Sequence, residues 1–281
     1  MPAASRLKSA RLGNGFTIAR MNLDLAGKHA LVCGASEGIG RAAAFELARL
    51  GATVTLLSRR EDVLRDIAAT LPRERGQAHD HLAADTANAA ALRAAVDALA
   101  ARQPVHILVN NTGGPPGGPA HAASIDAYLD AFHRHLVANQ TLVQALLPGM
   151  RAAHWGRIVN VISTSVYEPI PNLGVSNTIR GAVASWAKTL SRELGPDGIT
   201  VNNVLPGYTR TRRLEQILAD RSAASGKTQD EVAQAMLATV PVGRFAEAEE
   251  PGGVIAFLCT PTAAYVNGQS IAVDGGRMQS I

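Results

Sequence analysis

The segment His29-Ala-Leu-Val-Cys33-Gly34-Ala-Ser-Glu-Gly38-Ile-Gly40 joins an apolar run directly to a glycine-rich turn. Its first five residues are typical of a buried strand, and the alanine-rich stretch after Gly40 is typical of a helix. Glycines at such a turn allow a tight bend and let the backbone approach a pyrophosphate, which the helix N-terminus stabilises. The turn therefore predicts a dinucleotide site whose cofactor contacts are Gly34, Ser36, Glu37, Gly38, Ile39 and Gly40.

Apolar runs and helical patterns alternate along the rest of the chain. Further strands are predicted over 53–57, 78–82, 106–110, 157–162, 200–205 and 270–273, and helices over 38–50, 61–71, 88–102, 124–152, 176–194 and 247–258. Strands that are apolar throughout and alternate with helices form a parallel sheet covered on both faces. We therefore expect an α/β fold. It would be a single Rossmann-type, doubly wound parallel sheet of about seven strands over residues 21–281, with a lid at about 207–246.

The positive charge of the chain is concentrated at its start. Residues 1–20 contain four basic residues and no acid, and the whole chain has a net charge of +4, so the remaining residues sum to zero. We expect 1–20 to be a disordered extension, with Met21 as an alternative start of translation. No nucleic-acid motif accompanies this charge.

Other global features narrow the class of protein. No apolar run approaches the roughly 18 residues of a membrane span. The two cysteines, Cys33 and Cys259, lie in apolar segments, as reduced core cysteines do. The eight histidines show no metal-ligand spacing, so no metal is predicted. Together these features favour a cytoplasmic protein that acts on a small molecule, with neither nucleic acid nor membrane as a partner.

The ends of the later strands complete the predicted cofactor site. The second strand ends at Ser58 and Arg59, and a basic residue there suits the 2′-phosphate of NADP, whereas an acid suits NAD. Glu37 opposes this interpretation because its charge would repel the phosphate, and Arg59 has the alternative of a solvated helix start. We predict NADP(H), with NAD(H) as the alternative. Further cofactor contacts are predicted at Asp85, Asn111, Gly113, Pro206, Gly207 and Thr211.

Taken together, these residues resemble the short-chain dehydrogenase/reductase family over about residues 22–276. The matching signatures are Gly34-x-x-x-Gly38-Ile39-Gly40, Asn110-Asn111-x-Gly113, Pro206-Gly207-x-x-x-Thr211 and Asp274-Gly275-Gly276. The most similar group is the bacterial 3-oxoacyl carrier-protein reductases. The resemblance implies a single Rossmann domain, a homotetramer, a carbonyl or alcohol substrate and a catalytic tetrad of Asn, Ser, Tyr and Lys.

Only the serine of that tetrad is present, at Ser163. The tyrosine and lysine positions fall at Ser176 and Arg180, and the asparagine position falls at His135, with Asn139 as a weaker candidate one turn later. Lysine makes a neighbouring tyrosine a usable proton donor by stabilising the phenolate. Serine has a shorter reach and a higher pKa, and arginine keeps its proton. The resemblance therefore implies the family reaction with an altered proton donor.

Each of these four candidate catalytic residues has a functional and a structural interpretation. Ser163 either bonds a substrate carbonyl or caps a turn. Arg180 either binds ribose hydroxyls, a carboxylate or a developing alkoxide, or else forms a surface ion pair. Ser176 either belongs to the site or is a helix N-cap. His135 either relays protons or has a structural role.

Two functions from different classes fit this sequence. The first is an NADP(H)-dependent oxidoreductase, with Tyr167 and Tyr208 as alternative sources of the missing phenol. The second is a cofactor-binding protein without turnover, a sensor or a subunit of a hetero-oligomer, because the glycine loop is intact while the tetrad is not. The predicted lid indicates a substrate with an apolar and an anionic part, because it mixes Leu214, Ile217, Leu218, Met236 and Leu237 with Arg210, Arg212 and Arg213.

Overall fold

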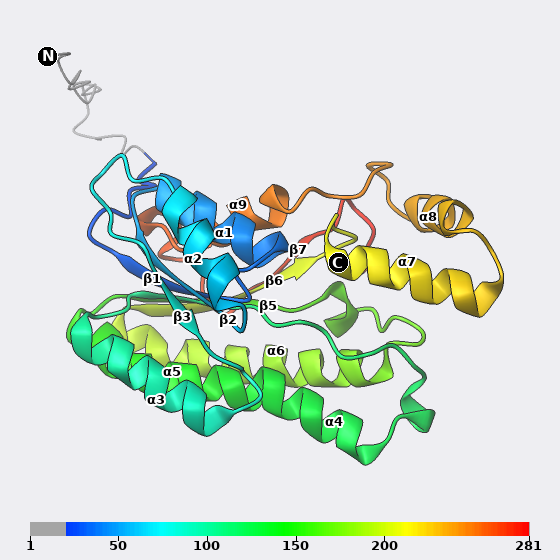
Figure 1. Cartoon of the computed structure of the whole chain (residues 1–281), viewed down its shortest axis with the longest axis horizontal. Coiled ribbons are helices and arrows are strands. Elements are labelled where there is room, and N and C mark those ends of the chain that lie inside the picture. Colours follow the sequence, from blue (N-terminus) through cyan, green and yellow to red (C-terminus); the bar gives the residue numbers. More distant parts are fainter. Residues whose placement is uncertain (1–20, 281) are drawn as a thin grey trace, which may run out of the picture.

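The glycine-rich turn lies where the sequence predicts it, between β1 (His29–Cys33) and α1 (Gly38–Arg49). The computed structural model describes residues 21–280, and the expectation for 1–20 lies outside them. The remaining strands are β2 (Thr53–Ser58), β3 (Asp80–Ala83), β4 (Ile107–Asn110), β5 (Gly156–Val161), β6 (Ile199–Pro206) and β7 (Ser270–Val273). Their order is β3-β2-β1-β4-β5-β6-β7, and all neighbours are parallel. The predicted doubly wound sheet is confirmed (Figure 1).

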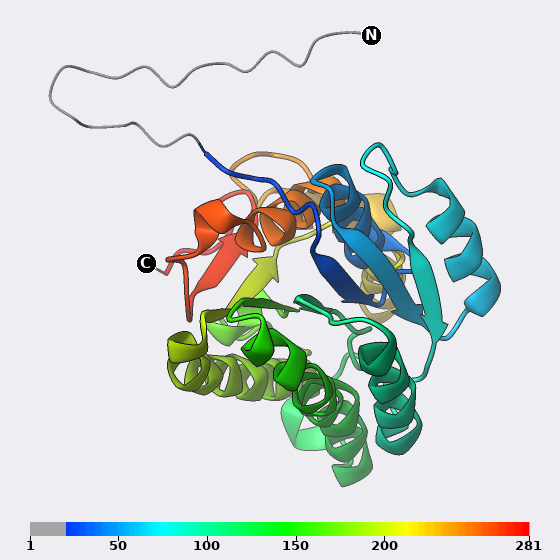
Figure 2. The same ribbon diagram turned by 90° about the vertical axis from the view of Figure 1, so that its left-hand side faces the viewer.

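A layer of helices covers each face of the sheet, as Figures 1 and 2 show. One face carries α1, α2 (Glu61–Thr70) and α9 (Glu249–Leu258), and the other carries α3 (Ala89–Arg102), α4 (Ile125–Phe132), α5 (Ala138–Ala152) and α6 (Gly174–Leu194). Each layer closes its own apolar core against the sheet. The strands are buried on both sides for this reason, and they are apolar throughout rather than alternating.

The two cysteines lie in these cores. Cys33 and Cys259 are free thiols and fully buried, as expected from their apolar neighbours. Burial raises the pKa of each thiol to about 12, so both remain protonated and unreactive near neutral pH. None of the helices within residues 21–280 is long and apolar enough to cross a membrane.

The helix predicted over 124–152 is interrupted near its middle. α4 ends at Phe132, a π-helical turn covers His133–Val137, and α5 continues from Ala138. A π turn inserts an extra residue into the helical repeat and shifts the register of the side chains around it, often beside a functional site. The prediction of one regular helix was wrong, because composition and periodicity do not distinguish a single π turn within a long helix. The turn buries His135.

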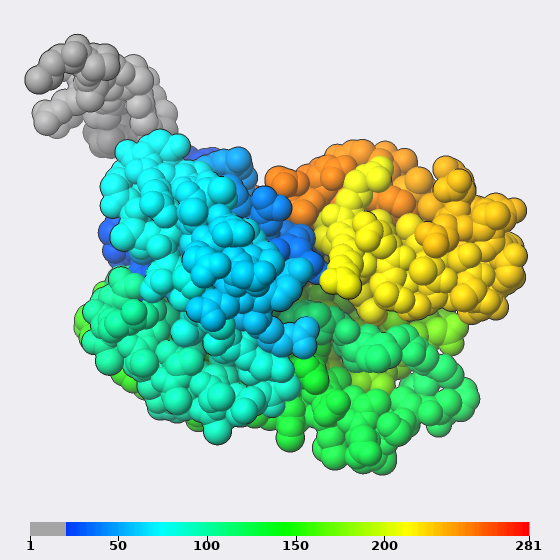
Figure 3. Space-filling model, in the orientation of Figure 1, coloured from blue at the N-terminus to red at the C-terminus, as the bar shows by residue number. Residues whose placement is uncertain are grey.

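The segment predicted to be a lid, 207–246, contains two helices, α7 (Arg212–Ser225) and α8 (Gln229–Leu237). Its apolar side chains form a small separate core around Leu214, Val232, Met236 and Phe245. In Figure 3 this yellow-to-orange segment forms a lobe at one end of the molecule. Most of the apolar residues thus stabilise the lobe itself, and α7 supplies the part that reaches the cleft described below.

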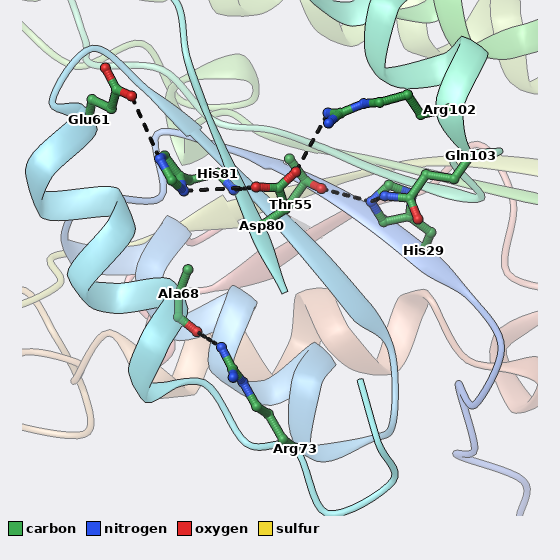
Figure 4. Close-up of polar contacts among 9 residues, drawn as sticks. All are labelled: His29, Thr55, Glu61, Ala68, Arg73, Asp80, His81, Arg102 and Gln103. Atoms are coloured by element: carbon green, nitrogen blue, oxygen red, sulfur yellow. Dashed lines mark hydrogen bonds and ion pairs between the residues drawn. The ribbon is translucent and has the colours of Figure 1, made fainter. Parts of the chain in front are cut away.

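A polar cluster lies where β1 begins, at the edge of the sheet opposite the glycine turn (Figure 4). The His29 ring bonds the Thr55 hydroxyl through Nε2 at 2.8 Å and the Pro104 carbonyl through Nδ1 at 3.2 Å. Nearby on β3, Asp80 lies 3.5 Å from the guanidinium of Arg102. Burial lowers the pKa of His29 to about 4, so its ring is neutral at physiological pH.

Candidate functional site

A cleft of about 1090 Å³ opens at the carboxyl edge of the sheet, beside the point where strand order reverses between β1 and β4. That volume is at the upper end of the range for small-molecule sites, as a dinucleotide together with a substrate requires. The predicted catalytic residues Ser163, Ser176, Arg180 and His135 all line it. So do the predicted cofactor contacts Gly34, Ser36, Glu37, Gly38, Ile39, Ser58, Arg59, Asp85, Asn111, Gly113, Pro206, Gly207 and Thr211.

Gly40 is the exception, and its role is packing. A methyl group at Gly40 would lie 2.4 Å from the Gly34 carbonyl oxygen, so a side chain there would force the turn open. Gly34 itself has a φ of +60°, and its carbonyl accepts a hydrogen bond from Asn111 Nδ2 at 3.3 Å. This bond joins the ends of β1 and β4. The floor of the cleft beneath the predicted pyrophosphate position is therefore built from glycine backbone and one amide.

The charge of Glu37, which complicated the cofactor prediction, is compensated in the structure. Its Oε2 accepts a hydrogen bond from Arg60 Nη2 at 2.7 Å, and the same Nη2 donates to Ser36 Oγ at 3.1 Å. Arg59 lines the cleft without an ion-pair partner among residues 21–280. The end of β2 thus offers one paired and one unpaired arginine, and this arrangement favours binding of a phosphate over a ribose hydroxyl.

Ser176 and Arg180 lie one turn apart on α6 and contact each other. Arg180 Nε donates to Ser176 Oγ at 3.2 Å, and Arg180 Nη1 donates to the carbonyls of Val161 and Ile162 at 3.1 and 2.9 Å. The expectation that Ser176 caps this helix was wrong, because the helix begins two residues earlier, at Gly174. The serine hydroxyl instead orients the guanidinium beside the end of β5.

The surface ion pair considered for Arg180 is also absent within residues 21–280. Its nearest charged neighbour is another arginine. A methyl group at Gly114 would lie 3.4 Å from Arg180 Nη2 and 3.7 Å from both Nε and Nη2 of Arg213. Burial, with a further contribution from Arg213, lowers the pKa of Arg180 to about 10. Arg180 therefore remains charged at neutral pH and faces a like charge.

His135 lies in the same cleft but is neutral. Its Nδ1 is 2.7 Å from the Thr112 hydroxyl, at the end of β4. Burial, together with the positive charges of Arg180 and Arg134, lowers its pKa to about 3. A proton relay through an imidazolium at this position is therefore unfavourable at neutral pH, and the contact with Thr112 supports a structural role.

Ser163 follows β5 and has both of the roles considered for it. Its Oγ accepts a hydrogen bond from the Ser165 backbone N–H at 3.1 Å and so caps a short 3₁₀ turn, while the residue lines the cleft. Because its oxygen accepts that bond, the hydroxyl proton is free to be donated to a substrate oxygen. Tyr208 lines the cleft as well, whereas Tyr167 is exposed and outside the lining within residues 21–280.

Among the cleft residues that were not singled out from the sequence, three have informative contacts. Arg60 neutralises Glu37, and Gly114 lies between two arginines, as described above. Arg277 reaches back from the far end of the chain, donates to Thr164 Oγ1 at 2.7 Å and stacks on the Tyr208 ring at 5.1 Å. For Gly114, the only signal in the sequence was the double glycine Gly113-Gly114. The contacts of Arg60 and Arg277 depend on tertiary structure and have no signal in the sequence.

Comparisons with known proteins agree with this geometry. The family model described as enoyl-(acyl carrier protein) reductase matches residues 34–277. The 3-oxoacyl-[acyl-carrier-protein] reductase of Pseudomonas aeruginosa is 34% identical over 262 residues, 92% of this chain and 100% of that protein. Cyclohexanol dehydrogenase of Rhodococcus sp. is 36% identical over 281 residues, which cover 92% of this chain and 99% of that protein. The crystal structure of L-sorbose reductase from Gluconobacter frateurii with NADPH and L-sorbose superposes with a TM-score of 0.86 at 29% identity. The match covers 93% of this chain and 100% of that chain.

Proposed function

Because the chain belongs to the short-chain dehydrogenase/reductase family of oxidoreductases, we propose that it transfers hydride between NADP(H) and a small carbonyl or alcohol substrate. The observation that carries this proposal is the cleft itself. It combines a glycine turn for a pyrophosphate, Arg59, which forms no ion pair within residues 21–280, for a 2′-phosphate, and Ser163 with Arg180 for a substrate. NADPH in the sorbose reductase structure supports the same choice of cofactor. NAD(H) is the weaker alternative, because no acid ends β2.

The roles of the residues follow from their contacts. NADPH, when bound, supplies the hydride. Ser163 donates a hydrogen bond to the substrate carbonyl oxygen, and Arg180 stabilises the negative charge that develops on that oxygen. Ser176 and the carbonyls of Val161 and Ile162 orient Arg180 for this role. Since arginine keeps its proton, and since a serine hydroxyl is a much weaker acid than a phenol, the alkoxide takes its proton from water.

The test is to titrate NADPH and NADH by calorimetry and then to follow NADPH oxidation with a panel of ketones and aldehydes. We expect tighter binding of NADPH and turnover of at least one carbonyl compound. The second candidate function is a cofactor-binding protein without turnover, which Ser176 and Arg180 at the tyrosine and lysine positions of the family favour. Binding of NADPH without oxidation across the panel would favour this second candidate, and failure to bind either cofactor would refute both.

We also propose that the protein is a homo-oligomer, with a tetramer as the expected state. Ile125, Leu129 and Phe132 lie on one face of α4 at helical spacing and are exposed by 73, 52 and 39%. Large apolar residues in such a stripe are unusual on a surface that contacts only water. A symmetric contact between helices of neighbouring subunits would bury them.

A further inference from the structure

We infer that the substrate carries a carboxylate, which binds between Arg180 and Arg213 over Gly114. This inference rests on the proposed function and identifies the class of substrate. Two observations carry it: a pair of arginines that form no ion pair within residues 21–280, and a glycine that leaves the space between them open.

Two ion pairs lie near the cofactor turn, whereas most arginines of the cleft lining have no ion-pair partner within residues 21–280. Near the cofactor turn, Arg60 pairs with Glu37, and Arg134 lies 3.9 Å from Asp85. The lining holds one other acid within the described part of the chain, Asp130. The arginines of the lining that have no ion-pair partner within residues 21–280 are Arg59, Arg180, Arg212, Arg213, Arg221 and Arg277.

Arg180 and Arg213 are held in place by neutral groups rather than by acids. Arg180 is bonded to a hydroxyl and two carbonyls, as described above, and Arg213 Nη2 donates to the Pro115 carbonyl at 3.0 Å. Each guanidinium retains N–H groups beyond these bonds, because arginine has five. Burial lowers the pKa of Arg213 as well, with Asp220 partly opposing the effect. Two orientated like charges in a partly desolvated cleft bind an anion strongly, and planar guanidinium groups match a carboxylate in particular.

Gly114 supplies the space between the two guanidinium groups. Its φ lies outside the left-handed region, so the backbone there does not require glycine. A β-carbon would stand within 3.4 to 3.7 Å of both arginines. The absence of a side chain therefore has its clearest effect on the volume between the two charges, which is where a carboxylate would bind.

The remaining surroundings limit the rest of the substrate. Ile162, Ile170, Leu173, Leu214 and Ile217 also line the cleft. An oxo acid with a short apolar chain, or the corresponding hydroxy acid, fits such a mixed lining. The reaction balances as a reduction in which the carbonyl carbon takes a hydride from NADPH, its oxygen takes a proton from water, and the carboxylate is unchanged.

Matched pairs of oxo acids and neutral diketones test this inference. The acids are pyruvate, acetoacetate and levulinate, and their partners are 2,3-butanedione, 2,4-pentanedione and 2,5-hexanedione, in which an acetyl group replaces the carboxylate. Binding is measured by calorimetry in the presence of saturating NADP⁺, so the readout does not depend on turnover. We expect at least one acid to bind tenfold or more tightly than its diketone, because hydrogen bonds to charged groups are the strong ones.

Three single variants test whether the preference for the acid depends on the space between Arg180 and Arg213. Arg213→Gln and Gly114→Val should abolish the preference for the acid, the first by removing a charge and the second by filling the space. Arg210→Gln is the control, because Arg210 is three residues away, pairs with Glu247 at 3.0 Å and is not part of the cleft lining within residues 21–280. It should leave the preference intact.

The outcomes distinguish this inference from the proposed function. Equal binding of the acid and the diketone in all three pairs would overturn the carboxylate assignment. So would a preference for the acid that survives in Arg213→Gln. A preference confined to dihydroxyacetone phosphate, tested in parallel, would also overturn it and identify a phosphate instead. Failure of the protein to bind NADPH in a separate titration would refute the proposed function, regardless of how tightly the oxo acids bind.

Discussion

At the scale of single residues, Ser176 and Arg180 are the pair whose replacement tests the proposed chemistry of the cleft. We expect the double variant Ser176→Tyr/Arg180→Lys to oxidise NADPH at least tenfold faster than wild type with an acetoacetyl thioester. A phenol beside an ammonium restores general acid catalysis, which typically contributes about 10²- to 10⁴-fold. Arg180→Lys alone should give no gain, because Ser176 still supplies no phenol. Initial rates at saturating NADPH for the three proteins provide the measurement.

A wild-type enzyme faster than the double variant would contradict this expectation and show that another group donates the proton. Tyr208 would then be the first residue to replace, because it lines the cleft while Tyr167 does not within the described chain. His135 is a weaker candidate, since its low pKa leaves it neutral at the pH of such an assay.

Arg59 and Arg60 should have separable effects on cofactor choice. Arg59→Ala should weaken NADPH binding about tenfold or more and leave NADH binding unchanged, because a charge-assisted bond to phosphate contributes about 1.5–3 kcal/mol. Arg60→Ala should also weaken NADPH binding, because it leaves Glu37 unpaired near the phosphate. Calorimetric titration of both cofactors measures this, with Arg65→Ala on the exposed side of α2 as the control. Equal losses for NADPH and NADH in Arg59→Ala would show that Arg59 does not contact the 2′-phosphate.

Much of this site could be predicted from the sequence, and the failures have a common physical cause. The glycine turn, Ser163 and Arg180 were predicted to share one site, and they line one cleft, because each follows a strand end or lies in the first two turns of a helix. The pairing of Glu37 with Arg60 was missed because the direction of a long side chain beyond a strand depends on tertiary contacts. Gly114 was passed over because a glycine in a glycine–proline cluster normally indicates a turn.

At the scale of secondary structure elements, the first strand carries a sensitivity to acid. His29 has a folded-state pKa of about 4 against an ordinary value near 6.5, so the unfolded chain binds the proton first as the pH falls. Stability is therefore complete above about pH 7 and decreases as the pH falls from 6.5 towards 4. Linkage gives a loss of about 2 kcal/mol from His29 between pH 7.5 and 5.

Urea unfolding at pH 7.5 and pH 5 measures this loss. His29→Gln should reduce the difference in the free energy of unfolding between the two pH values, although it lowers stability at pH 7.5 by disturbing the bonds to Thr55 and Pro104. The control is His121→Gln, because His121 is exposed. A pH dependence that is the same in His29→Gln and wild type would mean that His29 is not buried as a neutral ring.

Helix and strand boundaries show where sequence reasoning succeeds and fails at this scale. The strand β1 was predicted with its observed bounds, because Lys28 precedes it and the glycine turn that begins at Gly34 ends it. The π turn at His133–Val137 was not foreseen, because its residues have the composition of the helices on either side. Apolar residues of α7 and α8 were interpreted as a cover for a substrate, yet most of them pack on each other, since periodicity alone does not identify the partner of an apolar face.

At the scale of the whole molecule, the exposed stripe on α4 predicts the assembly state. We expect a tetramer by light scattering at micromolar concentration, and a smaller species for Leu129→Lys, because a charge in an apolar interface lacks a partner. Ala101→Lys, at an exposed position on α3, is the control and should leave the number of subunits in the assembly unchanged. A wild-type monomer would refute the proposal. Deleting residues 1–20 should change neither the number of subunits nor cofactor binding.

The open position at Gly114 also has a consequence for how this protein can diverge. A single change at the second base converts any glycine codon to one for aspartate or glutamate. Because φ at Gly114 lies outside the left-handed region, the backbone does not oppose such a change, and the new carboxylate would lie close to Arg180 and Arg213. That mutant should lose the preference for acids that we propose, because its own carboxylate would compete for the two guanidinium groups. A single nucleotide change would then shift the protein towards neutral ketones.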